Sequence, residues 1–221
     1  NVTLWLGNSQ LHAINQFKKG QETATVKLHR LAKKKNQHLI SISQPNANLQ
    51  EHFLISAYLI KKLPVKYIIL PVVFDDMRED GIRFSLKYLF EDKATINLIN
   101  KYETGNRLLS EYKNSNSNKN KNQNLQDKSE NYLNEKLGGV WSIWSERSDF
   151  RGNLFNFLYK FRNYVFNIDP STTRKILPGQ YTKNFQALNS LIKLTKDNKI
   201  KLIIYNVPIR NDVKIPYNKR E

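Results

Sequence analysis

Ser9 is the side chain whose setting most favours chemistry, because the tetrapeptide Gly7-Asn8-Ser9-Gln10 lies between a strand-like and a helix-like stretch. An apolar, β-prone run precedes it at 2–6, and apolar residues recur at helical spacing after it. A strand-to-helix turn exposes a hydroxyl, and N–H groups at a helix start can stabilise a tetrahedral oxyanion. Ser9 is therefore a candidate nucleophile, although a serine that only caps the helix fits the tetrapeptide equally well.

Three other loops are expected to join this turn at one edge of a sheet. Substrates of open α/β sheets bind outside the carboxyl ends of the strands. Further apolar runs end in polar loops at 44–48, 75–80 and 206–212. The residues that we expect to line a site at this edge, besides Ser9, are Gly7, Asn8, Gln10, Asn46, Ala47, Asn48, Asp75 and Asp76.

The run from Leu4 to Gln10 (LWLGNSQ) resembles the first signature of the SGNH (GDSL-like) hydrolase superfamily, which is a strand followed by Gly-Asp-Ser. Asn8 takes the place of the usual aspartate. The resemblance covers the framework at about 1–80 and 182–221. It implies a serine-dependent ester hydrolase or acyltransferase, without a cofactor, that acts on an acyl ester of a cell-envelope glycan or polymer. Ser9 would be the nucleophile, and its own amide would be one oxyanion donor.

The loops after the second and third strands depart from the family pattern. The family's second oxyanion donor is a glycine after the second strand, but the loop at 43–48 has none. An amide near Asn46 or Ala47 would have to serve instead. Asp75 and Asp76 stand where the family's Gly-x-Asn-Asp loop, with a third donor, belongs.

The histidine that the resemblance implies as general base has no counterpart, because the chain contains no Asp-x-x-His. The four histidines are His12, His29, His38 and His52. His12 and His52 could line the crevice, but an ordinary surface or partly buried histidine is the commoner case. We therefore expect the base beyond Glu221, in a longer protein, and little esterase activity from the given stretch alone.

The acids that follow the third strand allow a different interpretation. Asp75, Asp76, Glu79 and Asp80 fall within six residues, which suffices for a weak magnesium or phosphate-handling site. Their spacing matches no metal-binding loop, and acids at a strand end commonly cap the next helix. We therefore expect no metal.

The elements that must position these residues alternate between strands and helices. Helices are expected from 11 to 20, over 24–35 with Leu28, Leu31 and Ala32 inward, after the N-cap Asn48, and around 185–194. Strands are expected at 2–6, 39–42, 66–74 and 200–207, the last two buried on both faces. This order predicts a flavodoxin-like three-layer α/β sandwich with a mostly parallel sheet.

The alternation is interrupted between about 84 and 180, so we expect one incomplete domain over 1–221 with a helical, low-complexity insertion. Residues 113–130 have almost no apolar side chain to bury, which is typical of a solvated loop. An aromatic stretch from Trp141 to Phe166 follows. We expect it to be a lid or docking element beside the crevice, or else a core helix.

The charge bounds the kinds of partner. Lys+Arg 36 against Asp+Glu 19 gives a net charge of +17, which attracts anionic partners. The lysines stand in short scattered groups, a pattern that argues against a dedicated nucleic-acid reader. Peripheral contact with an anionic membrane stays open, and an inactive SGNH-like domain that binds an anionic glycan or membrane is the alternative function.

The absence of cysteine excludes thiol catalysis but leaves the compartment open, and the resemblance favours the cell envelope. The oligomeric state is not indicated.

Overall fold

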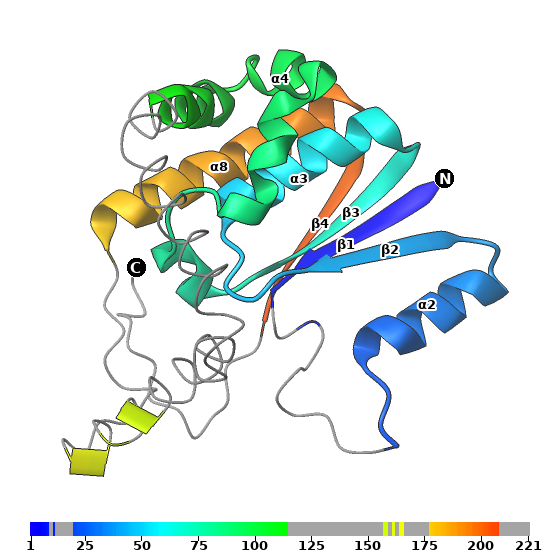
Figure 1. The fold of residues 1–221 in the computed structure, drawn as a ribbon. Coiled ribbons are helices and arrows are strands. Elements are labelled where there is room, and N and C mark those ends of the chain that lie inside the picture. Colours follow the sequence, from blue (N-terminus) through cyan, green and yellow to red (C-terminus); the bar gives the residue numbers. More distant parts are fainter. Residues whose placement is uncertain are drawn as a thin grey trace, which may run out of the picture. The chain divides into compact units, whose positions relative to one another are not determined.

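Four strands form one parallel sheet in the order β2-β1-β3-β4 (Figure 1). They are β1 (Val2–Gly7), β2 (His38–Ser43), β3 (Val65–Val72) and β4 (Lys201–Asn206). Each lies within two residues of a run predicted to be a strand. β1 pairs with β2 from Val2 opposite His38 to Gly7 opposite Ser43, so these two strands end side by side. The predicted α/β class with a parallel sheet is confirmed.

The structure is a computed structural model that describes residues 1–8, 11, 20–114, 157, 158, 161, 164, 165 and 177–207, with only the backbone at Phe74 and Asp75. The chain divides into two compact units. The first comprises Asn1–Tyr112 and Ile176–Ile209, and the second comprises Lys113–Lys175 and Arg210–Glu221.

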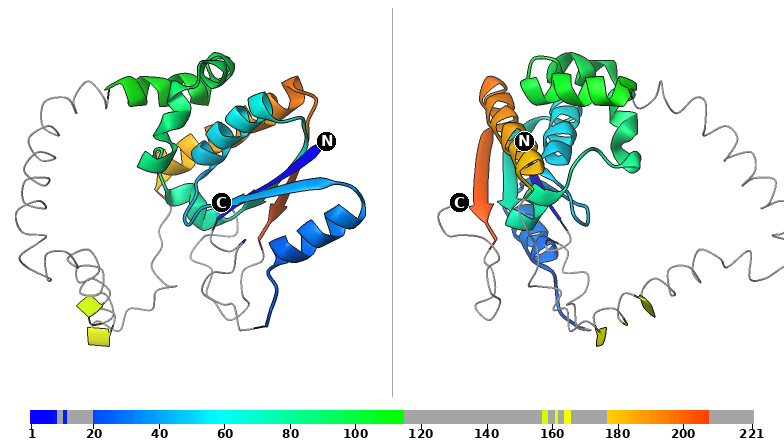
Figure 2. Two further views of the ribbon diagram at one scale, coloured as in Figure 1. Left: turned by 45° about the vertical axis from the view of Figure 1, so that its right-hand side comes forward. Right: turned by 90° about the vertical axis from the view of Figure 1, so that its left-hand side faces the viewer.

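Helices cover both faces of the sheet in the first unit. α3 (Leu49–Lys62) and α8 (Pro178–Asp197) pack on one face, where Phe53 and Leu191 meet Leu4 in the main core. α2 (Ala24–Lys34) lies on the opposite face, where Leu28 and Ala32 contact a smaller cluster (Figure 2). This smaller cluster contains Trp5, Leu11 and Leu39. The layers are therefore those of the predicted three-layer sandwich.

Local signals in the sequence begin these helices. Thr23 caps α2, which begins at the predicted residue. The Asn48 side chain accepts a hydrogen bond from the Glu51 amide, and the Glu51 carboxylate accepts one from the Asn48 amide, which is a capping box at the start of α3. Pro178 begins α8, seven residues before the predicted stripe.

Residues 84–112, which fall within the expected insertion, contribute to the main core. η2 (Phe84–Glu91), α4 (Lys93–Ile99) and a helix at 103–114 supply the buried side chains Leu89, Ile99 and Leu108. Gly105 allows the helix at 103–114 to touch the end of α4, since a Cβ there would overlap the Ile99 carbonyl oxygen. The first unit therefore extends to Tyr112.

The second unit is described at five residues, all apolar, helical and exposed: Phe157, Leu158, Phe161, Tyr164 and Val165. Residues 113 and 114, expected to begin a loop, instead end the helix at 103–114. The rest of the predicted loop to 130, the residues from Trp141 to Asn156, and residues 12–19 of the helix expected from 11 to 20 lie outside the described residues. No helix in the described part of the chain has the length and apolar character needed to cross a membrane.

Three predictions of burial are wrong. β4 is an edge strand, and Ile203 and Ile204 are each 41% exposed. Tyr67 of β3, expected to be buried, is 43% exposed. Leu31 was expected on the inner face of α2 but is 56% exposed. The cause in β4 is its place at the end of the sheet, because no strand among the described residues pairs with its outer side.

Candidate active site

The strand order determines where a ligand would meet the sheet. β2 and β3 lie on opposite sides of β1, and the helices that lead to them, α2 and α3, cover opposite faces. In such a sheet the crevice opens between the loops that follow β1 and β3, outside the carboxyl ends of the strands. Gly7 ends β1 and Asn8 follows it, while η1 (Phe74–Arg78) follows β3. The candidate site is therefore built at the edge where Asn8 and η1 meet.

Asn8 and Asp76 join these two loops by a buried contact. Asn8 Nδ2 donates to Asp76 Oδ1 at 3.1 Å and to Oδ2 at 2.8 Å. Asn8 is 5% exposed and Asp76 is 7% exposed. A hydrogen bond to an ionised carboxylate is stronger than one between neutral groups, and burial removes competing water. The contact therefore fixes the end of β1 against the loop after β3.

The last residue of β2 and the first residue of the loop after it bind the end of β1 from the other side. Ser43 Oγ donates to the Asn8 carbonyl oxygen at 2.6 Å. The Gln44 amide donates to the Gly7 carbonyl oxygen at 3.1 Å, which extends the β1–β2 pairing by one residue. The end of β1 is thus tied to both neighbouring strands.

Gly7 is required by a close approach of the chain to itself. A Cβ at position 7 would lie 2.8 Å from Leu11 Cδ2 and 2.9 Å from Leu11 Cβ. The Leu11 amide donates to the Asn8 carbonyl oxygen at 3.1 Å, so Leu11 returns beside the end of the strand. A larger residue at position 7 would push Leu11 out of the cluster that it shares with Trp5.

Arg83 holds the loop that follows β2. Its Nη1 donates to the Pro45 carbonyl oxygen at 2.9 Å, and its Nη2 donates to the Asn46 carbonyl oxygen at 3.1 Å. The guanidinium also pairs with the buried carboxylate of Glu51 through Nε at 2.7 Å and Nη2 at 2.8 Å. Asn46 has a φ of 54°, a conformation that asparagine tolerates better than most residues. The loop is therefore built in one shape by α3 and Arg83.

Ala47 and Asn48 are used in shaping this loop. The Ala47 amide donates to the Gln44 carbonyl oxygen at 3.2 Å. Asn48 caps α3 and donates through Nδ2 to the Gly81 carbonyl oxygen at 2.9 Å. Ala47 is 1% exposed and Asn48 is 2% exposed. Of the two amides expected as oxyanion donors, that of Ala47 is thus already engaged, and the prediction rests on the amide of Asn46.

Asn184 of α8 links the start of α3 to the segment after β3. It is fully buried and accepts a hydrogen bond from the Leu49 amide at 3.1 Å. Its Nδ2 donates to the carbonyl oxygens of Met77 at 3.2 Å and Glu79 at 2.8 Å. One amide side chain thereby fixes three elements around the candidate site.

His52 lies soon after the β2 loop in the sequence, but its surroundings do not suit a general base. It lies in the first turns of α3 at 2% exposure, and neither ring nitrogen has a hydrogen-bond partner among the described residues. Burial, together with the nearby Arg83 guanidinium, lowers the pKa of His52 to about 4. A buried imidazole without a partner cannot reach a substrate. His38 begins β2 at the opposite edge, and His29 is exposed on α2.

The predicted nucleophile Ser9, its neighbour Gln10 and His12 lie outside the described residues, as does the side chain of Asp75. Of the other predicted residues, the structure brings Gly7, Asn8 and Asp76 together at the switch point between β1 and β3. It places Asn46, Ala47 and Asn48 in the neighbouring loop after β2. The position of Ser9 relative to these groups stays a prediction.

Three residues at this edge were not recognised as site residues from the sequence: Ser43, Arg83 and Asn184. Ser43 directly follows the strand predicted at 39–42 and ends the observed β2, so its place beside Asn8 follows from the register of β1 and β2. Arg83 and Asn184 reach partners 32 and 135 residues away in the chain, and no local pattern indicates such pairings. The capping-box spacing from Asn48 to Glu51 was the available signal for Glu51.

Two of the acids after β3, Asp76 and Asp80, bond to protein groups. Asp80 accepts hydrogen bonds from Lys183 at 2.7 Å and from Gln50 at 3.2 Å. Burial opposes ionisation of Asp80, but these bonds and one from the Gly81 amide outweigh it and lower its pKa. In the described part of the chain, no three acidic, histidine or cysteine side chains gather as a metal site.

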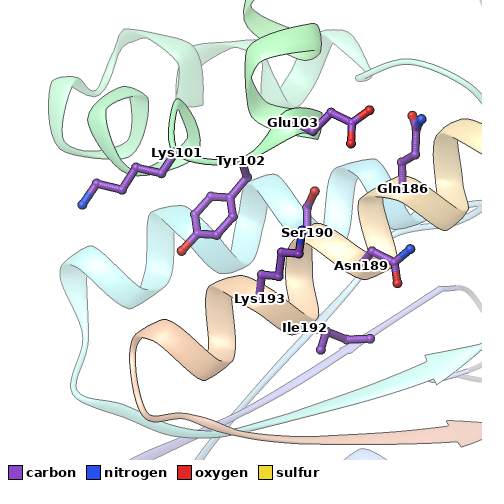
Figure 3. Close-up of a pocket in the computed structure, with 8 residues that line it drawn as sticks. All are labelled: Lys101, Tyr102, Glu103, Gln186, Asn189, Ser190, Ile192 and Lys193. Carbon is purple, nitrogen blue, oxygen red and sulfur yellow. The ribbon is translucent and has the colours of Figure 1, made fainter.

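A cavity of about 360 Å³ lies elsewhere, between α8 and the turn before the helix at 103–114 (Figure 3). Its lining includes Tyr102, Glu103, Asn189 and Ser190, while the Lys101 side chain points away from the other residues drawn. Tyr102 Oη bonds to Asp197 at 2.9 Å, and Ser190 Oγ to Thr104 at 2.9 Å. None of the site residues that the structure describes lines it, and neither do their hydrogen-bond partners named above. It is therefore separate from the candidate site.

A comparison of the chain with family models, curated proteins and solved structures gives no match.

Proposed function

We propose that this chain carries the nucleophile of an SGNH-type ester hydrolase or acyltransferase, and that Ser9 is that nucleophile. The observation that carries the proposal is the anchoring of Asn8, the residue before Ser9, at the point between β1 and β3 where ligands of such sheets bind. A serine that only capped a helix would not need a preceding residue tied both to the end of β2 and to η1, which follows β3.

The chemistry assigned to Ser9 is acyl transfer in two steps. Its Oγ attacks the carbonyl carbon of an ester while a base takes the hydroxyl proton. The tetrahedral intermediate collapses as the C–O bond to the alcohol breaks, and the base returns the proton to the departing alcohol. Water or an acceptor hydroxyl then attacks the acyl-serine, loses its proton to the same base, and releases Ser9 with its hydroxyl restored.

Amides would stabilise the negative charge of the intermediate. The Ser9 amide and the Asn46 amide are the proposed donors, the second presented by a loop that Arg83 and Glu51 hold in place. The base is not among the described histidines, because His29 and His38 lie elsewhere and His52 is buried. An acyl ester of a cell-envelope glycan or polymer as substrate rests on the sequence resemblance alone.

The test is hydrolysis of p-nitrophenyl acetate, and acetyl transfer from it to a glycan, by the product of the complete gene. We expect Ser9→Ala to lower kcat by about 10⁴-fold or more, because the remaining oxyanion donors cannot replace a nucleophile. Ser110→Ala is the matched control, since Ser110 bonds to the Arg107 carbonyl on the helix at 103–114, away from the sheet edge. Activity that survives Ser9→Ala would refute the assignment. A wild-type protein that binds anionic glycans without turnover would favour the inactive binding domain instead.

A further inference from the structure

We infer that the buried pair formed by Asn8 and Asp76, assisted by Ser43, is a positioning device for the nucleophile, and that its amide and carboxylate can exchange places. The inference rests on the proposed function, because it assigns to these residues the task of fixing the backbone that directly precedes Ser9. None of the three is proposed to touch the substrate.

The first step of the reasoning is that Asn8 is fixed at both its side chain and its main chain. The side-chain amide is held by the Asp76 carboxylate at 2.8 and 3.1 Å, from the β3 side. The carbonyl oxygen accepts from Ser43 Oγ at 2.6 Å, from the β2 side, and from the Leu11 amide at 3.1 Å. The residue that precedes Ser9 therefore has little freedom to rotate or shift.

The second step is that a buried carboxylate is retained at a cost in solvation. Asp76 is 7% exposed, and burying a carboxylate is unfavourable unless hydrogen bonds compensate. The Asn8 amide supplies such compensation on both carboxylate oxygens. A core that needed only packing would be served by apolar residues here. A buried polar pair is explained here if its role is to fix the direction that the backbone takes after Asn8.

The third step concerns the polarity of the pair. An amide facing a carboxylate is attractive in either order, whereas two carboxylates at about 3 Å repel each other in a buried site. The substitution N8D alone therefore breaks the pair. D76N leaves two amides, which keep one hydrogen bond without the charge. The double substitution N8D/D76N restores one amide and one carboxylate in the reverse order.

The experiment measures Ser9 directly in the product of the complete gene. A fluorophosphonate probe is added to wild type, N8D, D76N and N8D/D76N, and the rate of modification at Ser9 is followed by mass spectrometry, with kcat and KM for p-nitrophenyl acetate measured alongside. We expect N8D to slow Ser9 modification and kcat by about 100-fold, the size of effect that a misplacement of about 1 Å produces, with a much smaller change in KM. D76N should slow them less. The double variant should return to within about tenfold of wild type.

Two comparisons separate positioning from mere stability. Tm is measured for each variant, and rates are taken well below the lowest Tm, so that all variants are folded. D92N is the control, because Asp92 caps α4 and pairs with Lys62, and its loss should lower Tm without slowing Ser9 modification. Recovery of rate in N8D/D76N, beyond any recovery of Tm, supports the inference.

The inference is overturned if the probe modifies Ser9 as fast in N8D as in wild type. It is also overturned if Ser9 in the folded double variant is modified no faster than in N8D. Failure of the proposed function looks different. If Ser9→Ala keeps full turnover, Ser9 is not the nucleophile and the positioning role falls with it. If Ser9→Ala abolishes turnover while the double variant stays slow, only the positioning role fails.

Discussion

Asn8 carries an uncharged amide at a buried position, and the contact with Asp76 gives this choice of residue a physical reason. An aspartate at position 8 would bring a second carboxylate against a group that is 7% exposed. Asparagine offers nearly the same shape and a donor in place of the negative charge. The identities of residues 8 and 76 are therefore coupled, although 68 residues separate them in the chain.

His52 shows how a single buried group links pH to stability. Its folded-state pKa is lowered to about 4, first by burial and then by Arg83, whereas a histidine in the unfolded chain titrates near 6.5. Above pH 6.5 both states hold His52 neutral. Between pH 6.5 and 4 the unfolded chain binds a proton that the folded chain does not, so the free energy of unfolding falls as the pH falls.

We expect His52 to contribute up to about 3 kcal/mol of destabilisation between pH 7 and pH 4, since one pKa unit corresponds to about 1.4 kcal/mol. Urea unfolding of wild type and His52→Leu at half-unit steps of pH would measure it, because leucine fills the space and does not titrate. His38→Gln is the control at an exposed site. Equal slopes for wild type and His52→Leu between pH 6.5 and 4 would show that His52 titrates normally.

At the scale of elements, the ion pair of Glu51 and Arg83 joins the start of α3 to the start of η2, and the same guanidinium bonds to the loop after β2. The Glu51 side chain is 2% exposed, and the carboxylate also accepts a hydrogen bond from the Arg83 amide at 3.0 Å. Removal of Arg83 would leave this carboxylate buried without its cation, which is more costly than the loss of a surface pair. The loop carbonyls of Pro45 and Asn46 would lose their donors at the same time.

We therefore expect Arg83→Met to lower the free energy of unfolding by about 3 kcal/mol at pH 7. Arg83→Lys should recover only part of the loss, because an ammonium cannot reproduce the forked hydrogen bonds. Arg30→Met is the matched control, since Arg30 pairs with Glu22 on the surface of α2 and should contribute far less. Chemical unfolding of wild type and the three variants measures these free energies of unfolding. Similar decreases for Arg83→Met and Arg30→Met would contradict the role assigned to the buried ion pair.

The elements around the site could be predicted from the sequence because their signals are local. The β-branched run of β3 lies within eight consecutive residues, and the capping box lies within the four residues from Asn48 to Glu51. The exposure of Ile203 could not be predicted, because it depends on which strand lies at the end of the sheet. The bonds made by Asn184 could not be predicted either, since its partners come from two distant segments.

At the scale of the whole molecule, positive charge dominates the surface. The chain carries a net charge of +17, and α2 presents Lys27, Arg30, Lys33 and Lys34 as exposed cations. Glu22 pairs with Arg30, which offsets one of them. A field of this sign attracts anionic surfaces and weakens as salt is added. Charge alone gives weak, reversible attraction, so stable contact with a membrane also requires apolar side chains that can insert.

The second unit offers such side chains. Phe157, Leu158, Phe161, Tyr164 and Val165 are helical and recur at the spacing of one helix face. Their exposure ranges from 46% at Leu158 to 87% at Tyr164, and Phe157 stacks on Phe161 with ring centroids 6.2 Å apart. Lys160 and Arg162 stand between them in the sequence. This is the composition of a helix that lies in the membrane interface with its apolar face inserted.

We expect the protein to sediment with vesicles that contain anionic lipid, to bind neutral vesicles much less, and to lose most of the binding on Phe161→Ser. Phe84→Ser is the control, because Phe84 is an equally large ring, 79% exposed, in the first unit and outside the stripe. Added salt should weaken the binding of wild type, since the cations guide the helix to the surface, but apolar insertion should keep part of it at high salt. Equal binding by Phe161→Ser and wild type would attribute the attraction to charge alone. Failure of wild type to bind either vesicle at any salt concentration would exclude the membrane interface and leave the lid as the interpretation of these exposed side chains.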